Sequence, residues 1–279
     1  MSLRLRDALM RELGTLRYEP TEKRIRGELG DATTIDSTRA MLVWEPKRVV
    51  PTYAFPVEDI DAEIVLAPPS EDLDTSVGVS AMGVPLGDVM VFDPSIPFNV
   101  RTTPGEPLTI RCADGGRDVA AFRATDEALA GYVIVDFDAF DAWYEEDERN
   151  VGHPRDPFHR IDIVHSTRHV RIELDGEPLA ESSDPYLLFE PPIPVRYYLA
   201  PGDVRSELLA PSETRTFCAY KGEAFYLSHA GAADIAWYYP QPLRESAEVT
   251  GRIAFFSEHV DIIVDGTPLE RPQTPWSRR

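Results

Sequence analysis

Residues Leu42–Pro46 read LVWEP, and residues Leu187–Pro191 read LLFEP, 145 positions later. A single offset that aligns further positions on both sides indicates duplication of a whole domain, because a chance match of five residues does not extend. The repeat therefore predicts two domains with one fold, in keeping with a chain of 279 residues. The same offset aligns Ser37 with Ser182, Val50 with Val195, Tyr53 with Tyr198 and Pro56 with Pro201.

Short alternating segments predict that both domains are built from strands. Arg168–Leu174 alternates polar and apolar residues and runs into Asp175-Gly176, and Val260–Val264 runs into Asp265-Gly266. Alternation followed by Asp-Gly is a strong hairpin signal. The fold class that we expect is all-β, with two tandem homologous compact antiparallel β domains.

A short N-terminal helix is expected in front of the first domain. Leucines at helical spacing between Leu3 and Leu16 predict an amphipathic segment that ends at Gly14 or at a turn formed by Tyr18–Pro20. We place this helix in residues 1–20, the first repeat in 21–155 and the second in 156–279.

The first repeat carries an insertion. Glu45 and Gly105 are 60 residues apart, whereas their counterparts Glu190 and Gly222 are 32 apart, so 28 residues are added within about 60–98. This region belongs to a stretch, residues 49–100, that has no lysine or arginine. We expect part of it, around residues 67–72, to form a surface loop.

Charge and composition exclude several classes of function. The net charge of −20 makes nucleic-acid binding unfavourable, because acidic surfaces repel phosphate backbones. The sequence has no hydrophobic region typical of a secretory signal peptide and no apolar run long enough to span a membrane. We therefore expect a soluble, cytoplasmic protein without membrane contact. Cys112 and Cys218 occupy unmatched positions and form no Cys-x-x-Cys pair, which predicts neither a disulfide framework nor zinc. No cofactor fingerprint occurs, and the oligomeric state is not set by the sequence.

Several motifs carry a family resemblance across nearly the whole chain beyond the N-terminal helix. They are Arg24–Gly27, Val43–Pro46 with Val49–Pro51, Phe189-Glu190 with Pro194–Tyr198, and Cys218–Gly222. Together they resemble the domain of unknown function 427 family in tandem form, which is sometimes labelled nucleotidyltransferase-like. The resemblance implies a compact, predominantly β domain, with the β-tent type as one form. Its β-tent relatives hold zinc through paired Cys-x-x-Cys motifs that this chain lacks. Ala219 and Pro191-Pro192 also depart from the family pattern.

Reactive groups that only the second repeat contains indicate where function lies. Aligning the repeats places Arg196 against Pro51, Cys218 against Arg101 and Lys221 against Pro104, whereas Glu190 and Tyr198 have the counterparts Glu45 and Tyr53. Our catalytic candidates are Cys218 as nucleophile, Lys221 as the ammonium that favours its thiolate, and Glu190 as base or orienting group. The alternative is that Cys218 is a small buried apolar residue and that Lys221 anchors on Tyr220 or Tyr226.

A small anionic molecule is the ligand that these residue types favour. Arg196 and Lys221 can grip a carboxylate or phosphate, Tyr198 can supply a wall and a hydroxyl, and Tyr220 can act as acid. The default alternative for Arg196 is a structural ion pair with Glu190 around the proline-rich turn. Because the two rings alternate along a strand, we expect one of Tyr197 and Tyr198 in the core and the other free.

Two functions follow as hypotheses. The first is a small anionic ligand bound in the second domain, with or without catalysis. The second is a non-catalytic scaffold or protein-binding module that uses the acidic first domain. Four histidines between His153 and His169 have no spacing that suits a metal, and no metal site is expected from them.

Overall fold

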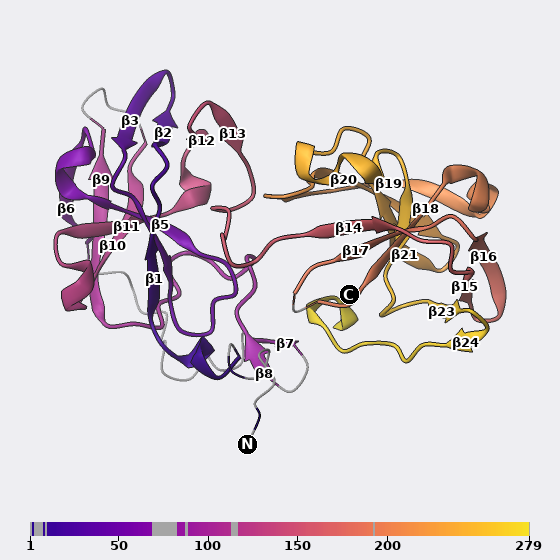
Figure 1. Cartoon of the computed structure of the whole chain (residues 1–279). Coiled ribbons are helices and arrows are strands. Elements are labelled where there is room, and N and C mark those ends of the chain that lie inside the picture. The colour runs from indigo at the N-terminus through magenta and orange to yellow at the C-terminus, as the bar shows by residue number, and fades with distance from the viewer. Residues whose placement is uncertain are drawn as a thin grey trace. The chain divides into compact units, whose positions relative to one another are not determined.

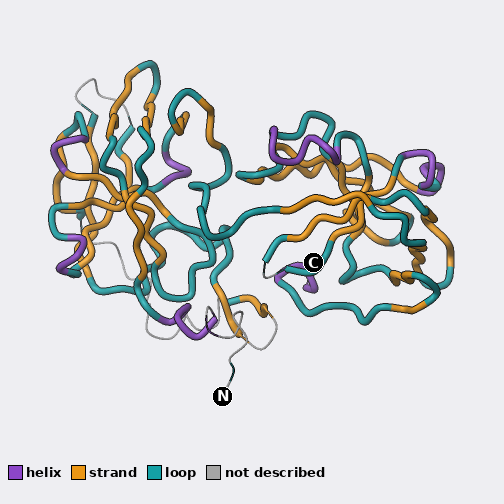
Figure 2. The backbone as a smooth tube through the Cα atoms, viewed as in Figure 1, coloured by secondary structure: helices purple, strands orange, loops and turns teal. Residues whose placement is uncertain are grey.

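The computed structural model describes residues 2, 8, 10–68, 83–86, 89–112, 117–191 and 193–278. It divides into two compact units, residues 1–84 with 89–156 and residues 85–88 with 157–279. The fold is all-β, as the sequence predicts (Figures 1 and 2). From Glu12 onward, the described helical segments are short 3-10 turns: η1 (Glu12–Gly14), η2 (Val57–Asp59), η4 (Glu127–Leu129), η5 (Phe137–Ala139), η6 (Pro201–Asp203), η7 (Ser206–Leu208), η8 (Arg244–Val249) and η9 (Pro275–Arg278). Within the described part of the chain, no helix has the length and apolar character needed to cross a membrane.

The first unit contains a seven-stranded and a four-stranded antiparallel sheet. Residues from both sheets form one cluster of buried side chains, which includes Leu42, Trp44 and Trp143. In order across the larger sheet, the strands are β1 (Arg17–Pro20), β4 (Met41–Trp44), β5 (Thr52–Pro56), β11 (Tyr132–Val135), β10 (Val119–Ala124), β9 (Gly105–Arg111) and β6 (Glu63–Leu66). The smaller sheet contains β13 (Glu148–Asn150), β12 (Ala142–Glu145), β2 (Ile25–Leu29) and β3 (Ala32–Ser37). A separate two-stranded sheet contains β7 (Val84–Leu86) and β8 (Val89–Val91), and residues 85–88 are grouped with the second unit.

The second unit has the same two kinds of sheet. Its seven-stranded sheet runs β14 (Asp162–His165), β17 (Tyr186–Phe189), β18 (Arg196–Leu199), β22 (Ile253–Phe255), β21 (Ala232–Tyr238), β20 (Gly222–His229) and β19 (Leu209–Cys218). Its four-stranded sheet runs β16 (Glu177–Ser182), β15 (Val170–Leu174), β23 (Asp261–Val264) and β24 (Thr267–Pro268). When strands are matched in chain order, the larger sheets of the two units have the same strand order from one edge to the other.

The seven-stranded sheet of each unit is covered on both faces. In the second unit, Leu187 and Tyr197 belong to the cluster between the sheets, whereas Leu188 and Tyr198 belong to a cluster on the opposite face. This arrangement explains why the segments around Leu187 read as continuous apolar runs, because residues of both parities are buried. The expectation that Tyr197 or Tyr198 would be free is therefore wrong, since both rings are buried.

Both Asp-Gly hairpins form as predicted. Leu174 pairs with Glu177 around Asp175-Gly176, and Val264 pairs with Thr267 around Asp265-Gly266, with positive φ at all four turn residues. At the N-terminus, residues 8, 10 and 11 are helical and the 3-10 turn η1 ends at Gly14; residues 1, 3–7 and 9 lie outside the described residues. The expected turn at Tyr18–Pro20 is wrong, because these residues form strand β1 beside β4.

The range of about 60–98, within which we place the insertion, includes a strand of the larger sheet. Strand β6 pairs with β9 in the larger sheet, at the edge that β19 occupies in the second unit, so residues 63–66 belong to the shared framework. Of the loop that we expect around residues 67–72, residues 69–72 lie outside the described residues.

Candidate functional site

Three ionisable side chains from distant segments meet in the second unit. Lys221 Nζ donates to Glu190 Oε2 at 2.5 Å, and His159 Nε2 lies 3.2 Å from Glu190 Oε1. Glu190 follows the last residue of β17, Lys221 precedes β20, and His159 precedes β14. The three linked side chains of His159, Glu190 and Lys221, which we call the His159–Glu190–Lys221 chain, form the centre of the candidate site.

Lys221 belongs to a hairpin turn that is buried, although turns normally lie at the surface. Ala219, Tyr220 and Lys221 are 0%, 2% and 8% exposed. Buried backbone groups need partners, and the segment around η8 supplies them: Leu243 N donates to Lys221 O at 3.2 Å, and Ser246 Oγ donates to Tyr220 O at 3.3 Å. The turn is therefore held inside the fold with the lysine ammonium in a fixed place.

The ion pair between Glu190 and Lys221 is fully charged. Burial raises the pKa of Glu190, but the Lys221 charge and the hydrogen bonds from His159 and Lys221 outweigh this effect and lower the pKa to about 2. Burial works in the opposite sense on Lys221, yet the neighbouring Cys218, Glu190 and Tyr198 groups raise its pKa above the ordinary value. At neutral pH, Glu190 is a carboxylate and Lys221 an ammonium.

Tyr198 and Cys218 lie within electrostatic range of the Lys221 ammonium. The Tyr198 hydroxyl accepts a hydrogen bond from Trp237 Nε1 at 3.1 Å, and burial raises its pKa to about 12. Tyr198 therefore stays protonated and can donate. Cys218 is the last residue of β19 and is partly buried, so the turn brings it near Lys221 despite their spacing of three residues.

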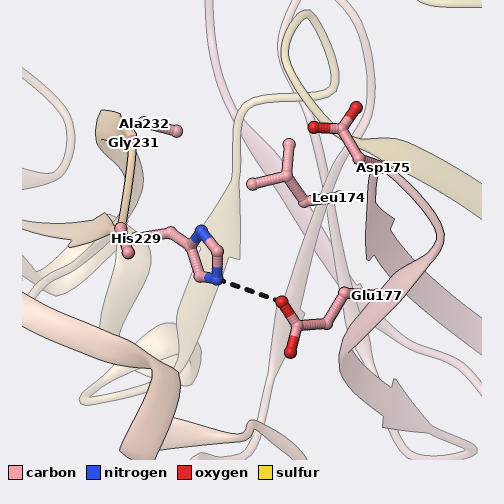
Figure 3. Close-up of a pocket in the computed structure, with 7 residues that line it drawn as sticks. Leu174, Asp175, Glu177, His229, Gly231 and Ala232 are labelled. Carbon is pink, nitrogen blue, oxygen red and sulfur yellow. Dashed lines mark ion pairs between the residues drawn. The ribbon is translucent and has the colours of Figure 1, made fainter.

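The accessible side of the site is formed by His159, whose side chain is 26% exposed. Its ring stacks on Tyr220 with centroids 6.0 Å apart, and the Arg160 guanidinium lies 5.2 Å from the centre of the Tyr220 ring. Arg160 also forms an ion pair with Glu245. Two cavities of this unit are lined by residues other than His159, Glu190 and Lys221, and the larger of the two lies between two hairpin turns (Figure 3).

The ion pair expected between Glu190 and Arg196 is wrong. Arg196 forms two hydrogen bonds of 2.7 Å with the Glu258 carboxylate and donates to Ser257 Oγ at 2.8 Å. The rings of Trp237, Phe256 and Trp276 surround its guanidinium at 5.4–5.6 Å. Arg196 is thus bound within the fold beside Trp237.

The histidines that cluster in the sequence do not gather in space. His165 lies 2.6 Å from Asp184 and His169 lies 2.8 Å from Glu181, each as a separate exposed pair. Within the described part of the chain, no group of three His, Cys, Asp or Glu side chains could hold a metal ion. Sequence reasoning set His159 aside with the other histidines, and no local motif marks its contact with Glu190.

The family model described as a domain of unknown function (DUF427) matches residues 162–266, which include Glu190, Lys221 and their neighbours in the candidate site but not His159 and Arg160. The second unit carries a DUF427 domain. The match begins at the first residue of β14 and ends at Gly266, in the turn between β23 and β24. No curated protein matches the chain.

Strand register matches the candidate-site residues of the second unit with other residues of the first unit than the sequence alignment does. Leu42 pairs with Tyr53, and the equivalent Leu187 pairs with Tyr197. Tyr198 therefore occupies the register position of Ala54, and Arg196 that of Thr52. The matches of Tyr198 with Tyr53 and of Arg196 with Pro51 are wrong by one residue, because the connection after Glu190 is one residue shorter than that after Glu45.

The register also moves the counterpart of Lys221. Pro107 pairs with Phe122, and Tyr226 pairs with Trp237. Phe122 and Trp237 in turn pair with equivalent positions of the neighbouring strand, so Pro107 and Tyr226 are equivalent. Counting back five residues from each gives Thr102 and Lys221, so the earlier match with Pro104 is wrong by two residues.

The first unit retains a carboxylate at the equivalent place but surrounds it differently. Glu45 is 1% exposed and accepts from Arg101 Nη1 at 3.0 Å and from Thr102 N at 3.4 Å, with Arg48 Nε 3.6 Å away. The Arg101 guanidinium lies 3.6 Å from the centre of the Phe98 ring and 4.4 Å from that of Phe122. Two arginines thus balance Glu45, where the DUF427 domain has one lysine and a partly exposed histidine.

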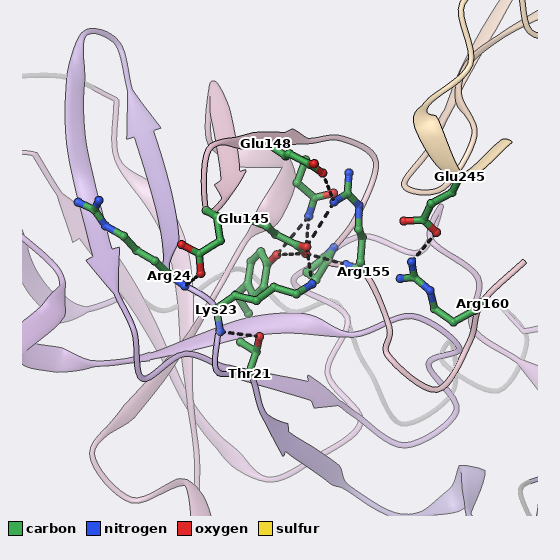
Figure 4. A network of polar contacts seen from close by, with 12 residues as sticks. Thr21, Lys23, Arg24, Glu145, Glu148, Arg155, Arg160 and Glu245 are labelled. Carbon is green, nitrogen blue, oxygen red and sulfur yellow. Dashed lines mark hydrogen bonds and ion pairs between the residues drawn. The ribbon is translucent and has the colours of Figure 1, made fainter. Parts of the chain in front are cut away.

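A second buried carboxylate of the first unit, Glu145, was missed in the sequence (Figure 4). It accepts from Lys23 Nζ at 2.6 Å, from the Tyr53 hydroxyl at 2.8 Å and from Asn150 Nδ2 at 3.4 Å, and Arg155 Nη1 lies 3.5 Å away. Burial and the neighbouring Glu145 raise the pKa of Tyr53 well above its ordinary value. The partners lie up to 122 residues apart, so no sequence pattern marks this network.

Proposed function

We propose that the DUF427 domain binds a small molecule bearing a carboxylate or phosphate at the His159–Glu190–Lys221 chain. The observation that carries the proposal is the Lys221 ammonium, which is held in a buried turn beside Tyr198 and Cys218 and balanced by one carboxylate. Buried charges in a fixed geometry are typical of binding sites, because they interact strongly with a ligand and need no rearrangement. The partly exposed His159 marks the side from which a ligand reaches the pair.

The protonation states favour binding over acid–base catalysis. Glu190 has a pKa of about 2, so it is too weak a base to remove a proton near neutral pH. Lys221 remains an ammonium and so cannot act as a nucleophile or base. Any covalent step in this proposal falls to Cys218, the thiol that lies within electrostatic range of Lys221.

The remaining candidates have distinct roles. Tyr198 is a neutral hydroxyl that can donate to a ligand oxygen. Tyr220, between His159 and Arg160, supplies an aromatic wall. We assign Arg196 to the framework, since its guanidinium is bound to Glu258 and enclosed by three rings, from where it supports Trp237 and, through it, Tyr198.

We further propose that the first unit is a second copy of the domain that lacks the ligand site. The matched strand orders and the shared buried glutamate support this proposal. In the first unit, Arg101 and Arg48 balance Glu45, and Ala54 stands where the second unit has Tyr198. The alternative function, a non-catalytic scaffold or protein-binding module that uses the acidic first domain, stays a prediction.

A thermal-shift screen of phosphate- and carboxylate-bearing metabolites tests the ligand proposal. The variant is Lys221→Met with Glu190→Gln, which removes both charges together and leaves no unpaired buried ion. A ligand at 100 times its Kd stabilises the wild type by about 2.7 kcal/mol, and we expect this gain to vanish in the double variant. Lys23→Met, a lysine substitution in the first unit, should keep it. No stabilising compound, or an equal shift in the double variant, would overturn the proposal.

A further inference from the structure

The smaller cavity of the second unit, about 170 Å³ in volume, lies against the core between the two sheets. Tyr197, Val260 and Ile262 line it, and all three belong to that core. Pockets for drug-sized ligands are larger, about 300–1,000 Å³, but an apolar cavity of about 150 Å³ can hold a benzene ring. The size of the cavity therefore suits a single ring.

The first unit has a phenyl ring at the position where the second unit has Ser257, a residue that lines the cavity. Ile134 and Ala254 are equivalent in strand register, and counting three residues on from each gives Phe137 and Ser257. A serine side chain leaves most of the volume of such a ring unfilled.

The neighbours of the Phe137 ring correspond to the walls of the cavity. The centre of this ring lies 6.2 Å from that of the Tyr53 ring and 5.5 Å from that of the Trp143 ring. The register equivalent of Tyr53 is Tyr197, and that of Trp143 is Ile262, because both pair with the residue that precedes the same register shift. Since Tyr197 and Ile262 both line the cavity, it lies where the first unit places an aromatic ring.

The absence of the Trp143 ring from the second unit is compensated, whereas the absence of the Phe137 ring is not. Trp143 packs on Gly27, where an added Cβ would come within 2.7 Å of Cζ3. In the second unit Ile172 takes the place of Gly27 and pairs with Ile262, so its side chain fills volume that the indole ring fills in the first unit. The space that corresponds to the phenyl ring is open as the cavity.

The lining favours an aromatic ring without a negative charge. The Tyr197 ring, which is 7% exposed, can pack against a ring as Tyr53 packs against Phe137. Among the described residues that line the cavity, the acidic Glu270 is the only charged one, and it disfavours an anionic substituent. The residues that the structure leaves undescribed include no Phe, Tyr, Trp or His, so another molecule has to supply the ring.

We propose that this cavity binds a small molecule through a single aromatic ring with a neutral or cationic substituent. The ring packs against Tyr197 and Ile262 in the place that Phe137 takes in the first unit. None of the residues that line the cavity belongs to the His159–Glu190–Lys221 chain, so this site and the proposed anion site stand or fall separately.

NMR titration of the full-length protein with benzyl alcohol, benzylammonium or cyclohexylmethanol tests the proposal. We expect saturable binding of the two aromatic compounds, with intermolecular nuclear Overhauser effects from their ring protons to the Tyr197 ring and the Val260 and Ile262 methyl groups. Cyclohexylmethanol, which is apolar but not flat, should bind at least tenfold more weakly. Benzoate should also bind at least tenfold more weakly at Tyr197, whatever its effect at Lys221.

Two substitutions of Ser257 separate the cavity from the hydroxyl group. Ser257→Phe restores the ring of the first unit and should weaken binding of benzyl alcohol at least tenfold. Ser257→Ala loses the same hydrogen bond with Arg196 but leaves the cavity open, and should bind as the wild type does. Ser183→Phe, at an exposed serine, is the control for an added ring. The wild-type titrations decide the proposal by themselves if Ser257→Phe does not fold.

Several results would overturn the proposal. One is the absence of saturable contacts to Tyr197 with either aromatic compound. Another is equal binding of cyclohexylmethanol or of benzoate there, which would contradict the preference for an uncharged or cationic aromatic ring. Unchanged binding in a folded Ser257→Phe variant would place the site elsewhere. Dimerisation that Ser257→Phe abolishes would assign the cavity to a second copy of the chain instead.

Discussion

Lys221 and Glu190 are 31 residues apart, and each is buried with the other as a counter-charge. Removing one partner leaves an uncompensated buried ion, whereas removing both leaves a neutral site of similar shape. We therefore expect Lys221→Met to lower the free energy of unfolding by about 3 kcal/mol. The double variant with Glu190→Gln should recover most of this loss. Urea unfolding of the two single variants and the double variant measures the coupling, and additive losses would contradict a direct ion pair.

The same pair predicts a pH dependence. The pKa of Glu190 falls from an ordinary 4.5 to about 2 in the folded protein, so its carboxylate stabilises the fold above pH 4.5. That contribution, about 3 kcal/mol, is lost as the pH falls from 4.5 to 2. Unfolding free energies measured between pH 2 and pH 6 should therefore change less steeply in the double variant than in the wild type. Parallel profiles would show that Glu190 titrates normally.

Single residues of the site were predictable from the sequence, but their partners were not. Cys218 and Lys221 stood out because the first repeat lacks them, whereas Glu190 and Tyr198 were matched with Glu45 and Tyr53; Glu190, Tyr198 and Cys218 all lie near Lys221 in the structure. Arg196 was expected to bond to Glu190, six residues away, but bonds to Glu258, which is 62 residues away. Local spacing cannot reveal a partner that a distant strand supplies, and the same limit hid His159 and Glu145.

At the scale of strands, the sequence predicts the two hairpin turns but not the register in which the strands pair. Asp-Gly after an alternating segment requires two positive φ angles that these residues adopt readily, so both hairpins follow from the sequence. The match of Tyr53 with Tyr198 failed because one residue is absent from the connection that precedes β18. A shift of one residue moves a side chain to the opposite face of a sheet. Tyr53 accordingly belongs to the cluster between the two sheets of its unit, whereas Tyr198 belongs to the cluster on the other face of the larger sheet of its own unit.

The packing of β2 against β12 gives a prediction at the same scale. A Cβ at Gly27 would lie 2.7 Å from Trp143 Cζ3 and 3.1 Å from Phe140 Cδ1. Because Trp143 is itself only 2% exposed and cannot move freely, Gly27→Ala should destabilise the first unit by about 1–3 kcal/mol. Gly14→Ala, where nothing lies within 4 Å of the added Cβ, is the matched control and should change stability by less than about 0.5 kcal/mol. Equal effects in thermal unfolding would show that Trp143 yields to the new methyl group.

For the whole molecule, the repeat predicts two domains, and the structure divides into two compact units with separate buried clusters. The two clusters of the first unit contain no residue of 157–279, and those of the second unit draw their residues from Ile161 to Trp276. Each unit thus has a hydrophobic core of its own, which is the property that lets a domain fold alone.

Residues 157–279 should therefore fold as an isolated segment. They contain the DUF427 domain, both of its sheets and every residue of the proposed anion site, and the C-terminal Trp276 packs against Phe256 with ring centroids 6.3 Å apart. We expect a cooperative urea transition and strand-type circular dichroism from the segment. Any ligand that stabilises the full chain through Lys221 should stabilise the segment equally. A shorter segment that ends at Gly266, the limit of the family match, lacks Thr274 and its 2.6 Å hydrogen bond to Glu258 as well as Trp276, and should be less stable. If the longer segment shows no cooperative transition, or if the truncation has no effect, the two cores are not the folding units that their composition indicates.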